Sequence, residues 1–414
     1  MTAGAVVERT GEGSTVTRAA TRVRRRIQLR LAGLLCLSVL CPGLVAPTAA
    51  AVDMRSRQWH LDAMQAERMW QLSTGEGVTV AVIDSGVDSS VPELRGQLLP
   101  GKDFTGRGRG ANHDDEGHGT SMAVIIAGKR SGAGPLGLAP GSKILPIKSI
   151  DGNWAVNMAK SIRYAADQGA KVINISQAGT VSEGNKTVLQ PAVDYANQKG
   201  SLVLAGTGNE GGRGNAPAYP ASLPGVVGIG AVDKSLKVAK FSTYGPQVAL
   251  AAPGVGIPTR CTTELRYCIE DGTSDATAIA SASVALIWSA HPDWTNNQVL
   301  RVMMETSGKP KDGKVPSKYL GYGIVRPRKV LLDKQGDPGP ADVNPLVAAH
   351  STAKPSETPQ PETTRGTNEA AQQSASRAED SHSRIWPIIG GIAVLAGVIA
   401  ISGLVIARRR RAQR

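Results

Sequence analysis

The chain has 414 residues and a formal net charge of +13 at pH 7, a length that suits one large domain with extensions or two ordinary domains. Residues 1–50 and residues 408–414 each carry a surplus of five positive charges, which leaves +3 of the +13 for the rest of the chain. A basic groove of the kind that binds nucleic acid is therefore not indicated, and we expect no nucleic-acid partner.

The first expected element is a secretory signal at residues 1–51. Arginines precede an apolar run at 31–45, and small residues follow up to Ala51. This order is typical of a signal peptide that is cleaved near Ala51. Residues 52–75 then form a short N-terminal lead-in.

Residues 76–332 alternate short apolar runs with helical patterns. The runs are rich in Val and Ile and do not alternate with polar residues, which is typical of strands buried on both faces of a parallel sheet. We expect strands at 78–84, 143–148, 171–176, 201–206, 226–232 and 247–253, and helices at 157–169, 187–200, 277–291 and after a Thr295 cap. The sequence predicts an α/β domain whose mostly parallel sheet is covered by helices on both faces.

The composition changes at about residue 333. Residues 333–384 are rich in Pro, Ser and Thr and poor in large apolar side chains, so we expect a disordered stalk. The next 23 residues, 385–407, carry no charge and are long enough to cross about 30 Å of hydrocarbon. The basic tail at 408–414 predicts a cytoplasmic C-terminus. We expect a single-pass protein of the cell membrane, with its main domain outside the cytoplasm.

Two cysteines remain outside the signal, Cys261 and Cys268, with a polar loop between them. In an oxidising compartment this spacing predicts a local disulfide. By the entropy of loop closure it would stabilise the fold by roughly 2–3 kcal/mol.

Polar residues flanked by glycine lie where a parallel sheet carries its chemistry, at strand ends and helix starts. Asp84 ends an apolar strand, and burying its carboxylate requires a partner. His118 lies between two glycines ahead of a helical run, where the backbone can bring its imidazole close to other groups. Each residue alone also fits a structural role, as a turn aspartate or a histidine at a helix start.

Two other kinds of site are disfavoured by their context. The segment HDDEGH brings His113, Glu116 and His118 together, but its glycine breaks the helical spacing of common zinc motifs. The run at 206–211 has the glycine spacing of a dinucleotide-binding turn, which must open a helix. Three prolines follow within 217–224 instead. We expect neither a metal nor another cofactor.

Four residues together supply the groups that acyl transfer needs. Asp84 offers a carboxylate, His118 an imidazole, Asn209 an amide donor and Ser274 a hydroxyl. These groups can orient a base, remove a proton, stabilise an oxyanion and attack a carbonyl. Ser274 alone, ahead of the small residues of DGTSDATAIASAS, would equally fit a closely packed helix.

These segments resemble the subtilisin-like serine proteases. The matching runs are AVIDSGVD, GHGTSMA, VINIS, GTGNEG and DGTSDA, and the order Asp, His, Ser is that of subtilisin. The resemblance implies a three-layer α/β fold and a serine endopeptidase that cleaves proteins or peptides. It implies that Asp84, His118 and Ser274 are catalytic and that Asn209 stabilises the oxyanion.

Within that family the chain is most similar to the mycosins, membrane-anchored subtilases associated with type VII secretion. The signal, lead-in, stalk, single span and basic tail all fit that architecture. The resemblance implies a type VII secretion membrane complex as a partner. It also leaves open an alternative, a mainly structural component of that complex with secondary or no proteolysis.

Two segments depart from the family pattern. Subtilases usually follow the serine with M-A-x-P, whereas this chain has Asp275 and Ala278 at the Met and Pro positions. The strand that lines the substrate commonly reads S-L-G-G, and here its residues are Ser176, Gln177, Ala178 and Gly179. We expect these four residues to contact the substrate through a pocket of altered shape.

Overall fold

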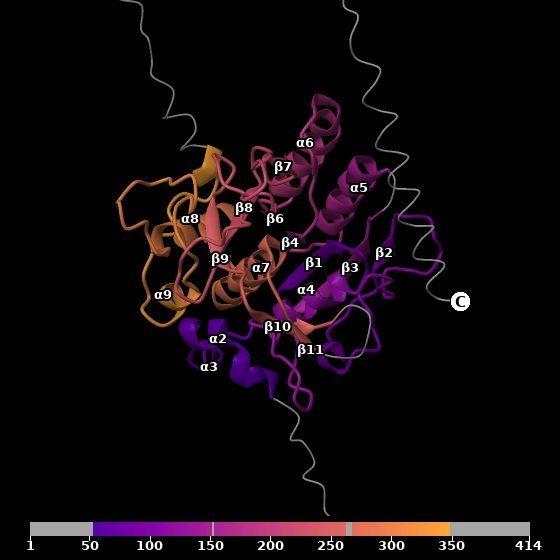
Figure 1. Ribbon diagram of the computed structural model, residues 1–414, viewed down its shortest axis with the longest axis horizontal. Coiled ribbons are helices and arrows are strands. Elements are labelled where there is room, and N and C mark those ends of the chain that lie inside the picture. The colour runs from indigo at the N-terminus through magenta and orange to yellow at the C-terminus, as the bar shows by residue number, and fades with distance from the viewer. Residues whose placement is uncertain (1–52, 151–152, 262–266, 348–414) are drawn as a thin grey trace, which may run out of the picture. The chain divides into compact units, whose positions relative to one another are not determined.

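Seven strands form the central sheet in the order β2-β3-β1-β4-β6-β8-β9, and all neighbouring strands run parallel. They belong to a computed structural model that describes residues 53–150, 153–261 and 267–347 (Figure 1). Six strands are those expected from the sequence: β1 (Thr79–Asp84), β3 (Lys143–Lys148), β4 (Val172–Ile175), β6 (Leu202–Gly206), β8 (Val227–Val232) and β9 (Leu250–Pro253). The predicted parallel sheet is confirmed.

The sequence did not predict the shorter strands. β2 (Lys102–Asp103) adds a two-residue edge to the sheet. Two separate antiparallel pairs consist of β5 (Gly179–Thr180) with β7 (Ala218–Tyr219), and β10 (Ile257–Arg260) with β11 (Tyr267–Glu270). Strands of two to four residues are too short to show a periodicity.

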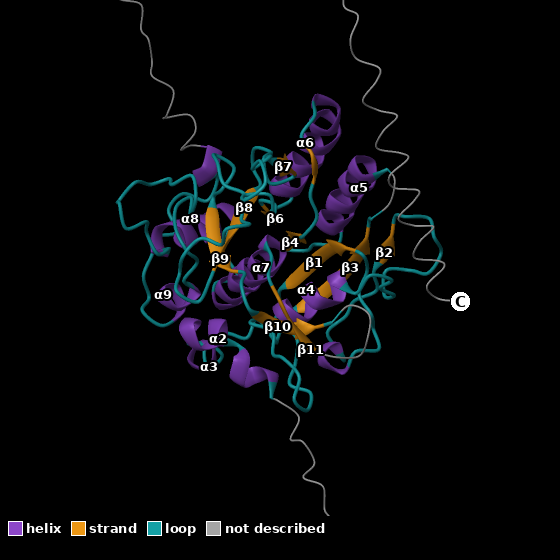
Figure 2. Ribbon diagram, viewed as in Figure 1, coloured by secondary structure: helices purple, strands orange, loops and turns teal. Residues whose placement is uncertain are grey.

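Helices cover both faces of the sheet, as expected (Figure 2). Side chains alternate along β1: Val80 and Val82 pack with α4 and α7, whereas Ala81 and Ile83 pack with α5 and α6. The bounds are α4 (His118–Ala127), α5 (Trp154–Asp167), α6 (Glu183–Gln198), α7 (Thr273–Ala290) and α8 (Asn296–Thr306). The predicted three-layer arrangement is confirmed.

Two helix starts bear on the site. α8 begins after Thr295, whose side chain accepts a hydrogen bond from the Gln298 backbone in a capping box, as predicted. α7 begins at Thr273, four residues before the predicted start at 277, because Gly272 is the N-cap. Ser274 therefore lies in the first helical turn.

The N-terminal lead-in is an integral part of the domain. It forms η1 (Met54–Arg57), α2 (Trp59–Met64) and α3 (Ala66–Met69). The indole of Trp59 donates to the Val255 carbonyl at 3.0 Å. Two further short helices lie at η2 (Pro92–Leu94) and α9 (Pro327–Leu331).

The first residues of the predicted stalk, 333–347, belong to the described part of the chain. Residues 333–347 lie against α8, where Gln298 donates to the Gly339 carbonyl at 3.0 Å and Arg301 donates to the Val343 carbonyl at 2.9 Å. Polar side chains of α8 hold this segment through its backbone, which its composition alone does not reveal. The remainder of the predicted stalk lies outside the described residues.

The segments that predict a membrane location also lie outside the described residues. These are the expected signal at 1–51, the apolar stretch at 385–407 and the basic tail at 408–414. Among the helices of residues 53–150, 153–261 and 267–347, none has the length and hydropathy needed to span a bilayer.

Cys261 and Cys268 do not form the predicted disulfide in this structure, where both are free thiols. In the hairpin register Cys268 lies opposite Thr259, two residues before Cys261. The two cysteines are therefore not cross-strand partners, although their side chains interact. Burial, followed by the contact with Cys261, raises the pKa of the Cys268 thiol.

Candidate active site

Asp84 is the last residue of β1, and the alternation of side chains directs it toward the face that α4 covers. Its side chain is fully buried. Oδ1 accepts hydrogen bonds from the backbone N–H of Ser85 at 2.8 Å and from Nδ1 of His118 at 2.8 Å. The expected contact between the carboxylate and the imidazole is present.

His118 is the first residue of α4. The backbone at the start of α4 approaches the backbone after β1 closely, which brings His118 to Asp84. A Cβ atom on the next residue, Gly119, would collide with the Gly86 carbonyl and lie 3.0 Å from the Asp84 Cβ. The N–H of Gly119 instead donates to the Ser85 hydroxyl at 3.0 Å. The glycine after the histidine is thus required for packing the helix start against the end of β1.

Electrostatics favour the protonated form of His118. The negative charge of Asp84 is the largest cause, and it raises the pKa of His118 to about 9 against the opposing effect of burial. The hydrogen bond that His118 donates to Asp84 adds to the rise, followed by the charges of Asp275 and Glu270. The neutral imidazole, which is the form that a general base requires, is therefore favoured only at alkaline pH.

Ser274 lies in the first turn of α7, and its hydroxyl faces the segment that follows β4. Its Oγ donates to the Ser176 carbonyl at 3.4 Å, while the Ser176 hydroxyl donates to the Ser274 carbonyl at 3.3 Å. Among the described residues, no hydrogen bond joins Ser274 to His118.

Asn209 follows β6 and is oriented by Thr273, the residue before the serine. Its carbonyl oxygen Oδ1 accepts from the backbone N–H and from the hydroxyl of Thr273, each at 3.0 Å. The exposed amide nitrogen is left to donate toward the cavity that Asn209 lines. An amide donor is thereby fixed next to the serine.

One cavity of about 460 Å³ is lined by Ser274 and by five other residues that the sequence analysis singled out. They are Asn209 and the four predicted substrate residues, Ser176, Gln177, Ala178 and Gly179. The opposite wall includes residues 216–218, which continue into β7. A hydroxyl and an amide therefore share a space large enough for a peptide side chain.

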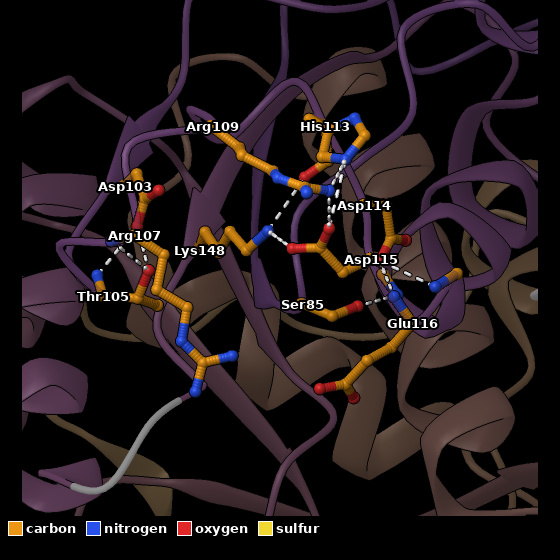
Figure 3. Close-up of polar contacts among 12 residues, drawn as sticks. Ser85, Asp103, Thr105, Arg107, Arg109, His113, Asp114, Asp115, Glu116 and Lys148 are labelled. Carbon is orange, nitrogen blue, oxygen red and sulfur yellow. Dashed lines mark hydrogen bonds and ion pairs between the residues drawn. The ribbon is translucent and has the colours of Figure 1, made fainter.

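The HDDEGH segment forms ion pairs (Figure 3). Asp115 accepts from Lys148 at 2.6 Å and from Arg109 at 3.0 Å, and His113 contacts the same carboxylate at 3.1 Å. Glu116 points away from this network. Within the part of the chain that the structure describes, no group of His, Cys, Asp or Glu side chains is placed to hold a metal ion.

Comparison with known proteins decides the family. The model of the subtilase family of peptidases matches residues 75–323, more than half of the chain. The chain belongs to the subtilase family. It is a subtilisin-like serine endopeptidase, as its motifs predict.

Relatives of known sequence and structure agree with this assignment. The subtilase is 38% identical over 281 residues to thermitase from Thermoactinomyces vulgaris, covering 67% of this chain and 96% of thermitase. The crystal structure of MycP1 from Mycobacterium smegmatis matches with a TM-score of 0.62 at 27% identity, over 71% of this chain and 89% of that one. MycP3 protease from the type VII (ESX-3) secretion system matches with a TM-score of 0.59 at 28% identity, over 68% and 89%.

Next to the cavity lies a packing contact that the sequence does not reveal. A Cβ atom on Gly179 would run into the indole of Trp154, the first residue of α5. Beside it, the Nε2 of Gln177 is buried and has no hydrogen-bond partner among the described residues. The departure from S-L-G-G thus places a buried, unsatisfied amide next to the cavity.

Two residues of the site were not assigned a role from the sequence. Thr273 orients Asn209, and its position directly before Ser274 was the available signal. Asp275 is buried directly after Ser274. Its signal was the departure from the usual Met, but burial cannot be read from one sequence.

Proposed function

We propose that this subtilase is a membrane-anchored, extracytoplasmic endopeptidase that uses Asp84, His118 and Ser274 as a catalytic triad. The observation that carries the proposal is the 2.8 Å hydrogen bond between His118 Nδ1 and a fully buried Asp84. This bond leaves Nε2 as the proton acceptor of the neutral imidazole. The nucleophile and the amide donor lie together at the substrate cavity.

In the proposed reaction, Ser274 Oγ attacks the scissile carbonyl carbon while its proton moves to Nε2 of His118. Asp84 stabilises the imidazolium, which then returns the proton to the leaving amine as the peptide C–N bond breaks. The Asn209 amide and the Ser274 backbone N–H stabilise the oxyanion. Water then hydrolyses the acyl-enzyme by the same proton path.

Before attack, the serine hydroxyl has to leave its resting partner. At 3.4 Å its hydrogen bond to the Ser176 carbonyl is long. Rotation about the Cα–Cβ bond of Ser274 moves Oγ to another staggered rotamer.

The membrane location and the secretion context are parts of the same proposal. Sequence patterns at both ends support the location: a signal-like segment, an apolar stretch at 385–407 and a basic tail. Structural similarity to MycP1 and to a type VII secretion MycP3 protease supports a secretion complex as the partner.

A second candidate function is a scaffold of that complex with little proteolysis. Two features favour it: the serine hydroxyl is bonded to Ser176, and Asp84 raises the pKa of His118 to about 9, which favours the protonated imidazole at neutral pH. Both features lower the population of a reactive triad at rest.

One pair of variants separates the two functions. Membranes that contain the full-length protein should cleave labelled casein at alkaline pH, and Ser274→Ala should abolish that cleavage. The matched control is Ser289→Ala, which removes an exposed hydroxyl that bonds the Glu76 carbonyl far along α7. Cleavage that persists in Ser274→Ala would contradict the protease assignment of these residues.

Complementation of a deletion strain then tests the physiological role. Loss of secretion with Ser274→Ala supports a protease role, and restored secretion with a cleavage-deficient Ser274→Ala protein supports the scaffold.

A further inference from the structure

Asp275 lies in the first turn of α7, directly after Ser274, and is 2% exposed. Its Oδ1 is buried without a hydrogen-bond partner among the described residues. A helix N-terminus favours a negative charge at this position, but a buried oxygen without a donor remains costly. The residue next to the nucleophile thus carries a carboxyl group with one unsatisfied oxygen.

A second carboxyl group connects Asp275 with the helix of the base. Glu270, the last residue of β11, accepts a hydrogen bond from the Ser121 hydroxyl at 2.8 Å. Ser121 lies one turn after His118 on α4. Glu270 also interacts electrostatically with both Asp275 and His118.

The charged groups around His118 therefore come from several elements. Asp84 on β1, Asp275 on α7 and Glu270 on β11 each favour its positive charge. Asp271 acts on Asp275 from the turn before α7, where its own side chain accepts the Gly256 N–H at 2.7 Å. His118 is enclosed by negative charge beyond its hydrogen-bonded partner.

Asp275 and His118 lose their protons in neighbouring pH ranges. Burial is the largest of the causes that raise the pKa of Asp275 to about 8, and the charge of Glu270 is the second. The positive charge of His118 lowers it. Since the pKa of His118 is about 9, the two groups lose their protons over overlapping pH ranges and each affects the other.

We propose that Asp275 and Glu270 are positioning residues that hold a proton on His118 and thereby set the lower edge of the pH range in which the enzyme acts. This inference rests on the proposed function, because it requires His118 to be the base. As the pH rises, Asp275 ionises while His118 is still protonated. The new carboxylate then stabilises the imidazolium and delays its deprotonation.

The coupling predicts the shape of the pH profile as well as its position. In the native enzyme the rate rises over a wider pH range than a single ionisation gives, because two groups titrate together. Without the Asp275 carboxyl, the rate follows one ionisation with a lower midpoint. A residue that served only packing would change neither the midpoint nor the steepness.

The test measures the rate at which a fluorophosphonate probe labels the full-length protein between about pH 6 and about pH 10. Asp275→Asn is expected to lower the midpoint by about half to one pH unit, which corresponds to about three- to tenfold faster labelling near pH 8. Glu270→Gln is expected to shift the midpoint in the same direction by less. The matched control is Asp194→Asn, which removes one carboxylate on α6 at the opposite face of the sheet.

Variants that fold with a melting temperature no lower than that of the native protein and leave the midpoint unchanged would overturn the inference. If Asp275→Asn does not fold, Asp275→Met and Glu270→Gln provide the same readout. If the native protein is labelled at Ser274 and the variants show no shift of the midpoint, only this inference is refuted. If the native protein is never labelled, or if the Ser274→Ala protein is still labelled, the proposed function is refuted and this inference with it.

Discussion

Two buried aspartates, Asp84 and Asp275, act on His118, and their surroundings differ. Asp84 accepts hydrogen bonds at Oδ1 from the Ser85 backbone and from the imidazole, although its Oδ2 has no partner among the described residues. Asp275 has no donor at Oδ1 and faces the charge of Glu270. The comparison shows that burial alone does not give a carboxyl group its role: the donors and charges around it do.

The largest expected effect on the rate comes from replacing the Asp84 carboxylate. Asp84→Asn should lower kcat by about 10⁴, because the amide no longer fixes the proton-accepting tautomer of His118. The measurement is steady-state cleavage of a peptide at alkaline pH. Asp275→Asn, the matched change on the other side, should retain most of the activity there. Equal losses in the two variants would contradict the assigned roles.

The next effect concerns the oxyanion donor that Thr273 orients. Asn209→Ala should lower kcat on the order of 10²–10³, as for the corresponding amide of subtilisin, with little change in KM. The matched control is Asn297→Ala, whose amide bonds the Ala341 carbonyl at the start of α8. A rise in KM at constant kcat would show that Asn209 only binds substrate.

A smaller effect concerns the contribution of Asp275 to the free energy of unfolding. A carboxyl group whose pKa is about 8 in the folded state and about 4 unfolded destabilises the fold as the pH rises between these values. Asp275→Asn removes this penalty, which for a shift of this size is on the order of 5 kcal/mol at pH 8. Its melting temperature relative to the native protein should therefore increase from pH 4 to pH 8. A difference that is constant with pH would contradict a neutral Asp275.

Some residues of the site can be predicted from the sequence alone and others cannot. Asp84 and His118 could be predicted because a continuous apolar strand ends at the first and glycines flank the second. Both features express local backbone requirements. The partners Thr273 and Asn209 could be placed near each other only through the family resemblance.

The surroundings of Asp275 could not be predicted from the sequence. They depend on the hairpin of β10 and β11, which is short and contains Pro258, Arg260 and Glu270 instead of an apolar run. The start of α7 at Thr273 depends on the extended backbone of Gly272. Long-range packing of short elements gave this carboxyl group its burial, and no local pattern encodes it.

The central claim is that Ser274 becomes nucleophilic through His118. The most direct measurement is mass-spectrometric mapping of a fluorophosphonate adduct on the full-length protein at about pH 9, near the pKa of His118. We predict an adduct on Ser274 that is strongly reduced in His118→Ala. An adduct on another residue, or undiminished labelling of Ser274 without the imidazole, would contradict the account.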